Sequence, residues 1–129
     1  MNIEESLYTA LVAAGTAAGA RVYPQLLPQN PTFPAITYSR IASRREYAHG
    51  GTTAINDILF QVSCWGATYT AAKALSAQVQ AALAGFTGLL GGPAGEYVGK
   101  SLVVDEADLY DPETGIFHVP VSFSIGIVE

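Results

Sequence analysis

An acidic cluster near the C-terminal end of the chain holds the side chains with the clearest potential for chemistry. Its members are Asp105, Glu106, Asp108, Asp111 and Glu113. A hard cation such as Ca²⁺ requires several oxygen ligands that converge from one loop. Asp105 and Glu106 are adjacent in a predicted strand, so their carboxylates point to opposite faces. The spacing therefore favours a solvated or partner-facing acidic edge, and we expect neither a metal ion nor a cofactor to bind there.

A basic cluster lies earlier in the chain and contains four of the eight Lys, Arg and His residues. Its members are Arg40, Arg44, Arg45 and His49. Three roles are open for it: a solvated hairpin tip, a contact with the acidic cluster of a neighbouring copy, or a surface that faces DNA in a channel. The residues that we predict at an interface are Arg40, Arg44, Arg45, His49, Asp108, Asp111 and Glu113.

Patterns that would indicate nucleotide binding or catalysis are incomplete. Residues 95–101 (GEYVGKS) look like a phosphate-binding loop, but Ala94 stands where the first Gly is required, and a strand is predicted to follow. No G-x-S-x-G nucleophile motif is present. Cys64 falls on the apolar face of its predicted strand, so we expect an inert buried thiol. An enzyme that uses the acidic cluster or His118 is the least favoured alternative, and we predict no enzymatic activity.

The composition indicates one domain, residues 1–129, with a sizeable core. Half of the residues are hydrophobic, while only 13% are charged, against a usual share of about 25%. This low charge favours a surface that is buried in an assembly. The formal net charge of -5 argues against general nucleic-acid binding, which requires clustered Lys and Arg. We find no secretion signal and no membrane-spanning run, so we expect no membrane partner.

The elements that must position the two clusters follow from two periodicities. Apolar residues recur at helical spacing over residues 2–18 and 68–83, with Thr68 as the predicted N-cap of the second helix and Gly85 just past its end. Alternating apolar residues predict strands. The predicted strands are residues 35–47, 55–65, 100–110 and 116–128.

Prolines and glycines mark the connections between these elements. Four prolines between residues 24 and 34 predict an extended connector on the surface or at a sheet edge. Residues 85–99 hold six glycines and predict a loop. Pro120 indicates that the last strand lies at an edge or carries a local break. The predicted fold is α+β, with a mainly antiparallel four-stranded sheet, two helices on one face and the order α-β-β-α-β-β.

Over nearly its whole length, the chain resembles the small tail-completion or tail-terminator proteins of long-tailed bacteriophages and prophages. The resemblance begins with the N-terminal helix and with VYP, LPQ and FPAITY within residues 22–38. It continues with residues 60–72 (FQVSCWGATYTAA) and with residues 105–115 (DEADLYDPETG). These are motifs of pattern and order rather than catalytic motifs, so the resemblance carries no active-site residue over to this chain.

The resemblance implies a structural virion protein at the interface of head and tail. Such a subunit forms a ring, usually a hexamer, that caps the head-proximal end of the tail tube. It joins the tube to the head connector, meets DNA only as the DNA passes through the channel, and assembles in the cytoplasm of the bacterial host. The alternative is a small cytosolic adaptor that binds a protein or peptide along a sheet edge.

Overall fold

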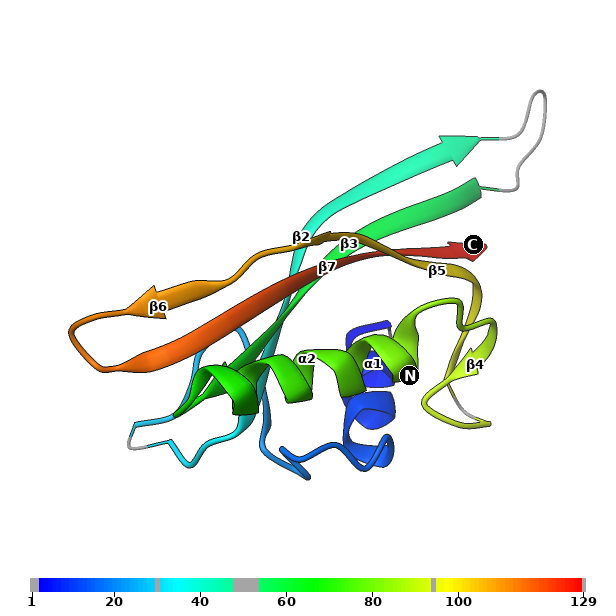
Figure 1. Cartoon of the computed structure of the whole chain (residues 1–129). Helices are drawn as coiled ribbons and strands as arrows, with labels where there is room; N and C mark the ends of the chain where they lie inside the picture. The colour runs from blue at the N-terminus through cyan, green and yellow to red at the C-terminus, as the bar shows by residue number, and fades with distance from the viewer. Residues whose placement is uncertain (1–2, 30, 48–53, 94, 129) are drawn as a thin grey trace.

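The computed structural model describes residues 3–29, 31–47, 54–93 and 95–128. It contains two helices and a seven-stranded, curled sheet (Figure 1). The helices are α1 (Ile3–Ala13) and α2 (Tyr69–Leu83). The strands are β1 (Val22–Pro24), β2 (Ala35–Tyr47), β3 (Ala54–Gly66), β4 (Gly88–Leu90), β5 (Glu96–Glu106), β6 (Leu109–Asp111) and β7 (Ile116–Val128).

The sheet is larger and less regular than the sequence predicted. Its strand order is β1-β2-β3-β7-β5-β4, and β6 pairs with β7 beyond the end of β5. β1 runs parallel to β2, whereas the other pairs are antiparallel. The α+β class is confirmed, but the prediction of four antiparallel strands in the order α-β-β-α-β-β is wrong. The sheet is mixed because β1 adds a parallel edge.

The two short edge strands arise in segments that were predicted as connections. β1 lies within the proline-rich segment, where Pro24 can occupy an edge strand because its missing N–H need not join a ladder. β4 lies in the glycine-rich segment and pairs with the beginning of β5. Each has only three residues, so long-range pairing rather than local periodicity defines it.

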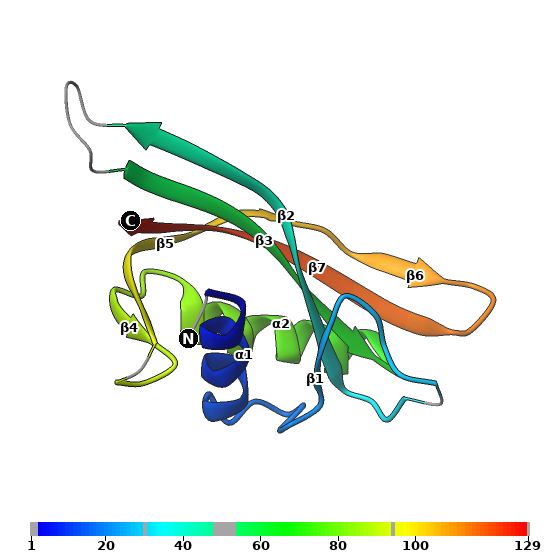
Figure 2. The same cartoon turned by 180° about the vertical axis from the view of Figure 1, so that it is seen from behind.

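The core lies between one face of the sheet and the two helices, which are on the same side of it (Figure 2). Alternate residues of β3 and β7 supply its centre, and Phe60 faces Phe123 across the ladder. The helices close it with Leu7 and Leu75, neither of which is exposed. The other buried hydrophobic residues with at most 1% exposure are Leu11, Ala18, Ala35, Ile36, Ile58, Val62, Cys64, Ala72, Val79, Leu83, Val98, Val119, Val121 and Ile125.

The connection from β3 to α2 confirms the predicted cap. The Thr68 hydroxyl accepts a hydrogen bond from the Ala71 N–H at 3.1 Å, which satisfies one free donor of the first turn. Gly85 has a φ of 74° just past the helix, as predicted. Gly66 packs against the same turn so closely that a Cβ there would lie 2.8 Å from the Ala72 nitrogen.

Pro120 coincides with a break in the strand beside β7 rather than with an edge. β5 ends at Glu106, opposite Val121, and β6 begins at Leu109, opposite His118. Between them, the Ala107 N–H donates to the Pro120 carbonyl at 3.1 Å. The N–H and C=O of a strand residue point to the same side. The N–H that Pro120 lacks would therefore point toward the gap between β5 and β6, where no regular ladder exists.

Three bulges distort the long strands that flank the central pair. β2 has one extra residue at Ile41, between Arg40 and Ala42, relative to β3. β5 has one at Gly99, between Val98 and Lys100, and one at Val104, between Val103 and Asp105, relative to β7. Bulges of this kind bend a strand and increase its twist. They contribute to the curl of the sheet, whose outer face has a hollow of about 260 Å³ lined from four strands.

Candidate interaction surface

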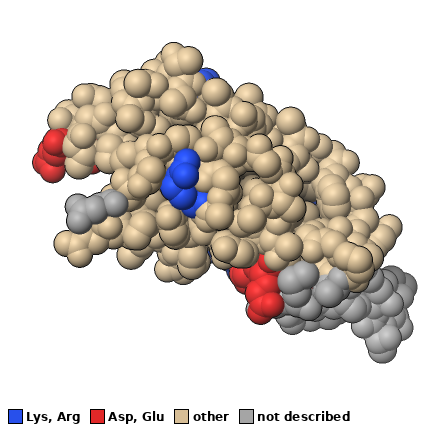
Figure 3. Space-filling view, turned by 90° about the horizontal axis from the view of Figure 1, so that it is seen from below, with Lys and Arg blue, Asp and Glu red and all other residues tan. Residues whose placement is uncertain are grey.

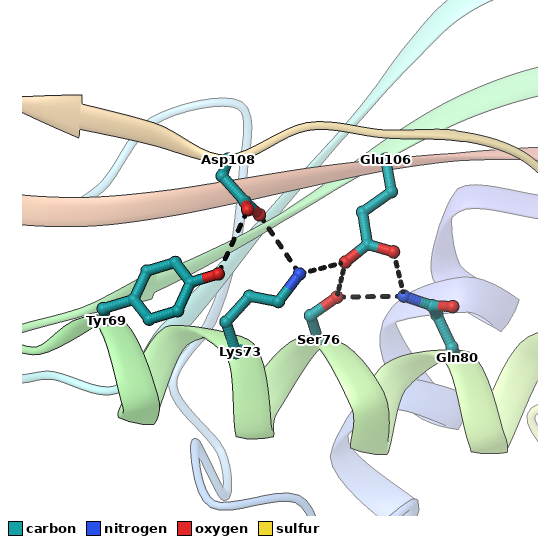
Figure 4. A network of polar contacts seen from close by, with 6 residues as sticks. All are labelled: Tyr69, Lys73, Ser76, Gln80, Glu106 and Asp108. Carbon is teal, nitrogen blue, oxygen red and sulfur yellow. Dashed lines mark hydrogen bonds and ion pairs between the residues drawn. The ribbon is translucent and has the colours of Figure 1, made fainter.

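A polar network ties helix α2 to the junction of β5 and β6 (Figure 4). The Lys73 ammonium donates to Glu106 at 2.9 Å and to Asp108 at 3.1 Å. The Tyr69 hydroxyl donates to the other oxygen of Asp108 at 3.2 Å. These residues are about one turn apart on the exposed side of the helix, so the network positions the junction against the helix.

Glu106 is the centre of this polar network. Its carboxylate also accepts hydrogen bonds from Ser76 at 3.3 Å and from Gln80 at 3.1 Å. The hydrogen bond from Lys73, followed by that from Gln80, lowers the pKa of Glu106. The same contact raises the pKa of Lys73. Glu106 and Asp108 therefore share one lysine within the chain, and both carboxylates already have hydrogen-bond partners before any other molecule approaches.

The tip of the β6–β7 hairpin holds the rest of the acidic cluster. The Asp111 carboxylate accepts a hydrogen bond from the Glu113 N–H at 3.0 Å, which stabilises the turn between β6 and β7. Gly115 closes the turn with a φ of 72°. Glu113 is exposed, and among the described residues no contact of its carboxylate is found.

Aromatic side chains lie beside this acidic tip. Phe117 contacts Tyr110 with ring centroids 4.7 Å apart and Tyr69 with centroids 6.0 Å apart. Tyr69 and Tyr110 are about half exposed, at 49% and 55%. Exposed aromatic groups at the rim of a charged patch are typical of protein interfaces. Sequence reasoning missed this group because its members come from three separate elements.

The basic cluster lies elsewhere, and the structure does not bring it into contact with the acidic tip. Arg40 forms an ion pair with Glu4 of α1, so it too has a partner within the chain. The backbones of Arg44 and Arg45 lie in the last part of β2, opposite Asp57 and Asn56 of β3. This end of β2 and the β6–β7 turn are at opposite ends of the molecule (Figure 1). The predicted interface residue His49 lies outside the described residues.

Trp65 and His118 form a stacked pair on the outer face of the sheet. Their ring centroids are 3.9 Å apart and the angle between their planes is 4°. The Trp65 indole N–H donates to the Thr37 hydroxyl at 2.9 Å. Burial lowers the pKa of His118, so the neutral imidazole is favoured. The Trp65 ring thus packs across β3 and β7 on the face that the helices do not cover.

The described residues offer no assembled reaction centre. No group of three or more His, Cys, Asp or Glu side chains within this part of the chain is arranged to hold a metal ion. Cys64 is fully buried, and burial followed by the nearby Glu106 charge raises the pKa of its thiol to about 12. The thiol is therefore a poor nucleophile at neutral pH. Neither α1 nor α2 is both long and apolar enough to cross a membrane.

Most of the helix-bearing surface carries no charge. Figure 3 shows it from below, with acidic side chains near two margins and few Lys or Arg side chains between them. The hollow between α1, α2 and β4 is lined by alanine, glycine, leucine and phenylalanine only. Such a surface can contact another protein without the cost of removing charges from water.

Comparison with known proteins identifies the family. The family model of tail completion protein gp17 matches residues 5–127. In fold, the chain is similar to a chain of the structure described as the virion of a native gene transfer agent particle, with a TM-score of 0.63 and 18% identity over 98% of both chains. No curated protein matches the chain in sequence. The chain belongs to the family of tail completion protein gp17, the structural proteins of bacteriophage virions at the head–tail region.

Proposed function

We propose that this chain is a ring-forming subunit that caps the head-proximal end of the tail tube and joins it to the head connector. The observation that carries the proposal is the family match over residues 5–127. Completing a tail requires that tube growth stops and that the head finds a docking surface. A closed ring on the last tube layer meets both needs, with one rim on the tube and the other on the connector.

The distribution of charge supports a ring with two different rims. A contact between two different surfaces of the same chain produces a ring when its rotation closes. The basic end of β2 and the acidic tip of the β6–β7 hairpin are at opposite ends of the molecule. In a ring whose axis runs along the strands, Arg44 and Arg45 therefore belong to one rim, and Glu113 and its neighbours belong to the other. The resemblance to tail terminators favours six copies.

The ring passes DNA without binding it. The chain has a formal net charge of -5, and a mostly acidic channel repels phosphate groups rather than holding them. The partners that we assign are therefore other copies of the chain, the tail-tube protein and the head-completion or connector protein. The low share of charged residues, 13%, fits a subunit with contacts on several sides.

The mass of the native particle across a concentration series, followed by negative-stain imaging of the largest species, tests this proposal. We expect a closed ring with a central hole at high concentration. A particle that binds isolated sheared tails at the head-proximal end would support the assigned position. A two-fold dimer, or a monomer that binds neither itself nor tails, would contradict the ring and favour the adaptor alternative.

A further inference from the structure

Among the described residues, the sheet has two long edges without a neighbouring strand, one on β2 and one on β5. The free parts of these two edges lie at the same level along the strands. In one row, Leu102 of β5 connects through β7 and β3 to Ala42 of β2. Four residues along β5, Glu106 connects in the same way to Tyr38. The free part of β5, residues 102–106, is therefore level with residues 38–42 of β2 on the opposite edge.

Both edges lack a neighbouring strand within the described part of the chain. β4 covers β5 only at Glu96–Val98, and the Gly85 N–H then donates to the Ser101 carbonyl at 2.7 Å. β1 covers β2 only as far as Tyr38, whose carbonyl accepts the Gln25 N–H at 2.8 Å. Beyond these points, each strand presents backbone donors and acceptors that require a partner.

The two edges are complementary in composition. Along β5, Leu102, Val103 and Val104 are 53%, 38% and 59% exposed, an unusual apolar run for an edge strand. In the free part of β5, residues 102–106, Asp105 and Glu106 give a formal charge of −2. In the matching part of β2, residues 38–42, Arg40 gives a formal charge of +1. Two copies of β2 or two copies of β5 would each bring like charges together.

The strand directions also fit. β2, β3, β7 and β5 alternate in direction across the sheet, so β5 runs opposite to β2. A rotation about an axis along the strands keeps these directions. It therefore places β5 of one copy antiparallel to β2 of the next, and antiparallel pairing is the more stable arrangement.

We propose that neighbouring copies in the ring join by adding the β2 edge of one copy, residues 39–43, to the β5 edge of the next, residues 102–106. This inference rests on the proposed ring and names the surface that closes it. The occupant of the exposed β5 edge is a second copy of this chain, and the sheet continues from subunit to subunit.

Backbone direction selects the residues for a test. Residues alternate along a strand, and the Ser101 carbonyl points to the free edge, so the N–H of Val103 does too. The Tyr38 carbonyl points to the same edge of β2, because it accepts the Gln25 N–H. Arg40 lies two residues further along β2, so its N–H points to that edge as well. Val103→Pro and Arg40→Pro each remove one outward donor and leave the internal ladder intact. Val103→Ala and Arg40→Ala are matched controls that keep the N–H.

The experiment measures the mass of each variant and of a mixture by analytical ultracentrifugation, with circular dichroism to establish folding. We expect the alanine variants to assemble like the wild type and each proline variant to lose assembly. A 1:1 mixture of Val103→Pro and Arg40→Pro retains one intact edge of each kind. It is expected to give a heterodimer and nothing larger.

Several results would overturn the inference. If the Val103→Pro variant still forms rings, the contact between copies lies elsewhere, and the proposed function is unaffected. If the wild-type particles are not rings, the proposed function itself is contradicted. A wild-type chain that stays monomeric up to about 1 mM, a range of very weak association, would also overturn edge pairing. If the Val103→Pro variant fails to fold, hydrogen exchange of the wild-type amides decides between the outcomes. An amide of residue 103 that is protected only in the assembled particle supports the pairing. An amide that exchanges at the same rate in the monomer and in the assembled particle refutes it.

Discussion

The indole ring of Trp65 lies flat against the imidazole ring of His118, with ring centroids 3.9 Å apart. The contact joins β3 to β7 on the face of the sheet that the helices do not cover. The Nε2 atom of His118 is buried and has no hydrogen-bond partner among the described residues. The imidazole is therefore held by stacking and burial, and a proton on it would be poorly solvated.

This arrangement predicts a loss of stability in weak acid. Burial lowers the folded-state pKa of His118 below its ordinary value of 6.5, so the unfolded chain takes up the proton first. The free energy of unfolding should fall as the pH decreases from 6.5 towards the folded-state pKa. Denaturant titrations between about pH 7 and pH 5 measure this dependence. His118→Asn should lack most of it, and an unchanged dependence in that variant would contradict the assignment.

Glu106→Gln tests the polar network. The contact with Lys73 lowers the pKa of the Glu106 carboxyl in the folded state. The charged carboxylate therefore stabilises the fold fully above the unfolded-state pKa of 4.5, and this stabilisation is lost as the pH falls through the folded-state pKa. The variant should be slightly less stable than the wild type at pH 7 and should lose less stability on acidification. Asp105→Gln, on the adjacent position, is the control. Equal behaviour of the two variants would argue against a specific role for Glu106.

Val121→Asp tests the assignment of the two faces of β7. Val121 is completely buried, so the change places an unpaired carboxylate in the core and should cost at least about 3 kcal/mol, enough to prevent stable folding. Ser122→Asp changes the next residue, which is only partly buried on the opposite face. Thermal unfolding followed by circular dichroism should show a folded Ser122→Asp protein and an unfolded Val121→Asp protein.

Gly66→Ala tests the close packing of β3 against α2. The added Cβ would lie 2.8 Å from the Ala72 nitrogen, and backbone must move to accept it, at a cost of about 1–3 kcal/mol. At Gly99, also in a strand, the nearest atom to an added Cβ is 3.8 Å away. Gly99→Ala should change stability by no more than about 0.5 kcal/mol. Similar unfolding midpoints for the two variants would show that the junction adjusts freely.

Reversing the charge of Arg44 and Arg45 tests the contact at the basic rim of the ring. The double change to Glu should leave the circular dichroism spectrum unchanged and abolish assembly with the partner at that rim, because the charge that the partner meets is reversed. The double change to Gln should weaken assembly less, and its salt dependence should be smaller than that of the wild type. Unfolding of the Glu variant would instead show that this part of the β2–β3 hairpin is buried.

Local sequence patterns located the long elements of the fold, although α1 ends at Ala13 rather than at residue 18, and the predicted strand over residues 100–110 is split between β5 and β6. The alternation in β3 correctly assigned Cys64 to the buried face. Thr68 and Gly85 marked the ends of α2, because capping and positive φ depend on a few neighbouring atoms. These features are encoded within a few residues of where they occur.

The parts that sequence reasoning missed depend on contacts between distant segments. β1 exists because it pairs with β2, and β4 because it pairs with β5. Two contacts of predicted interface residues were missed for the same reason: Arg40 pairs with Glu4, and Asp108 pairs with Lys73. A pairing between residues 73 and 108 has no signal in local periodicity, since it requires α2 to lie along the junction of β5 and β6.

The bulges at Ile41 and Val104 have a consequence for errors in assembly. An edge with a regular backbone accepts almost any extended segment, which exposes a concentrated, weakly charged protein to aggregation in the crowded host cell. A bulged edge accepts only a segment whose backbone follows the same irregular path. The two bulges lie one row apart in the sheet, one on each free edge. If the two edges pair as proposed, the bulges restrict each edge to a strand with a matching irregular path, and the irregularity would then protect the subunit against pairing with other segments.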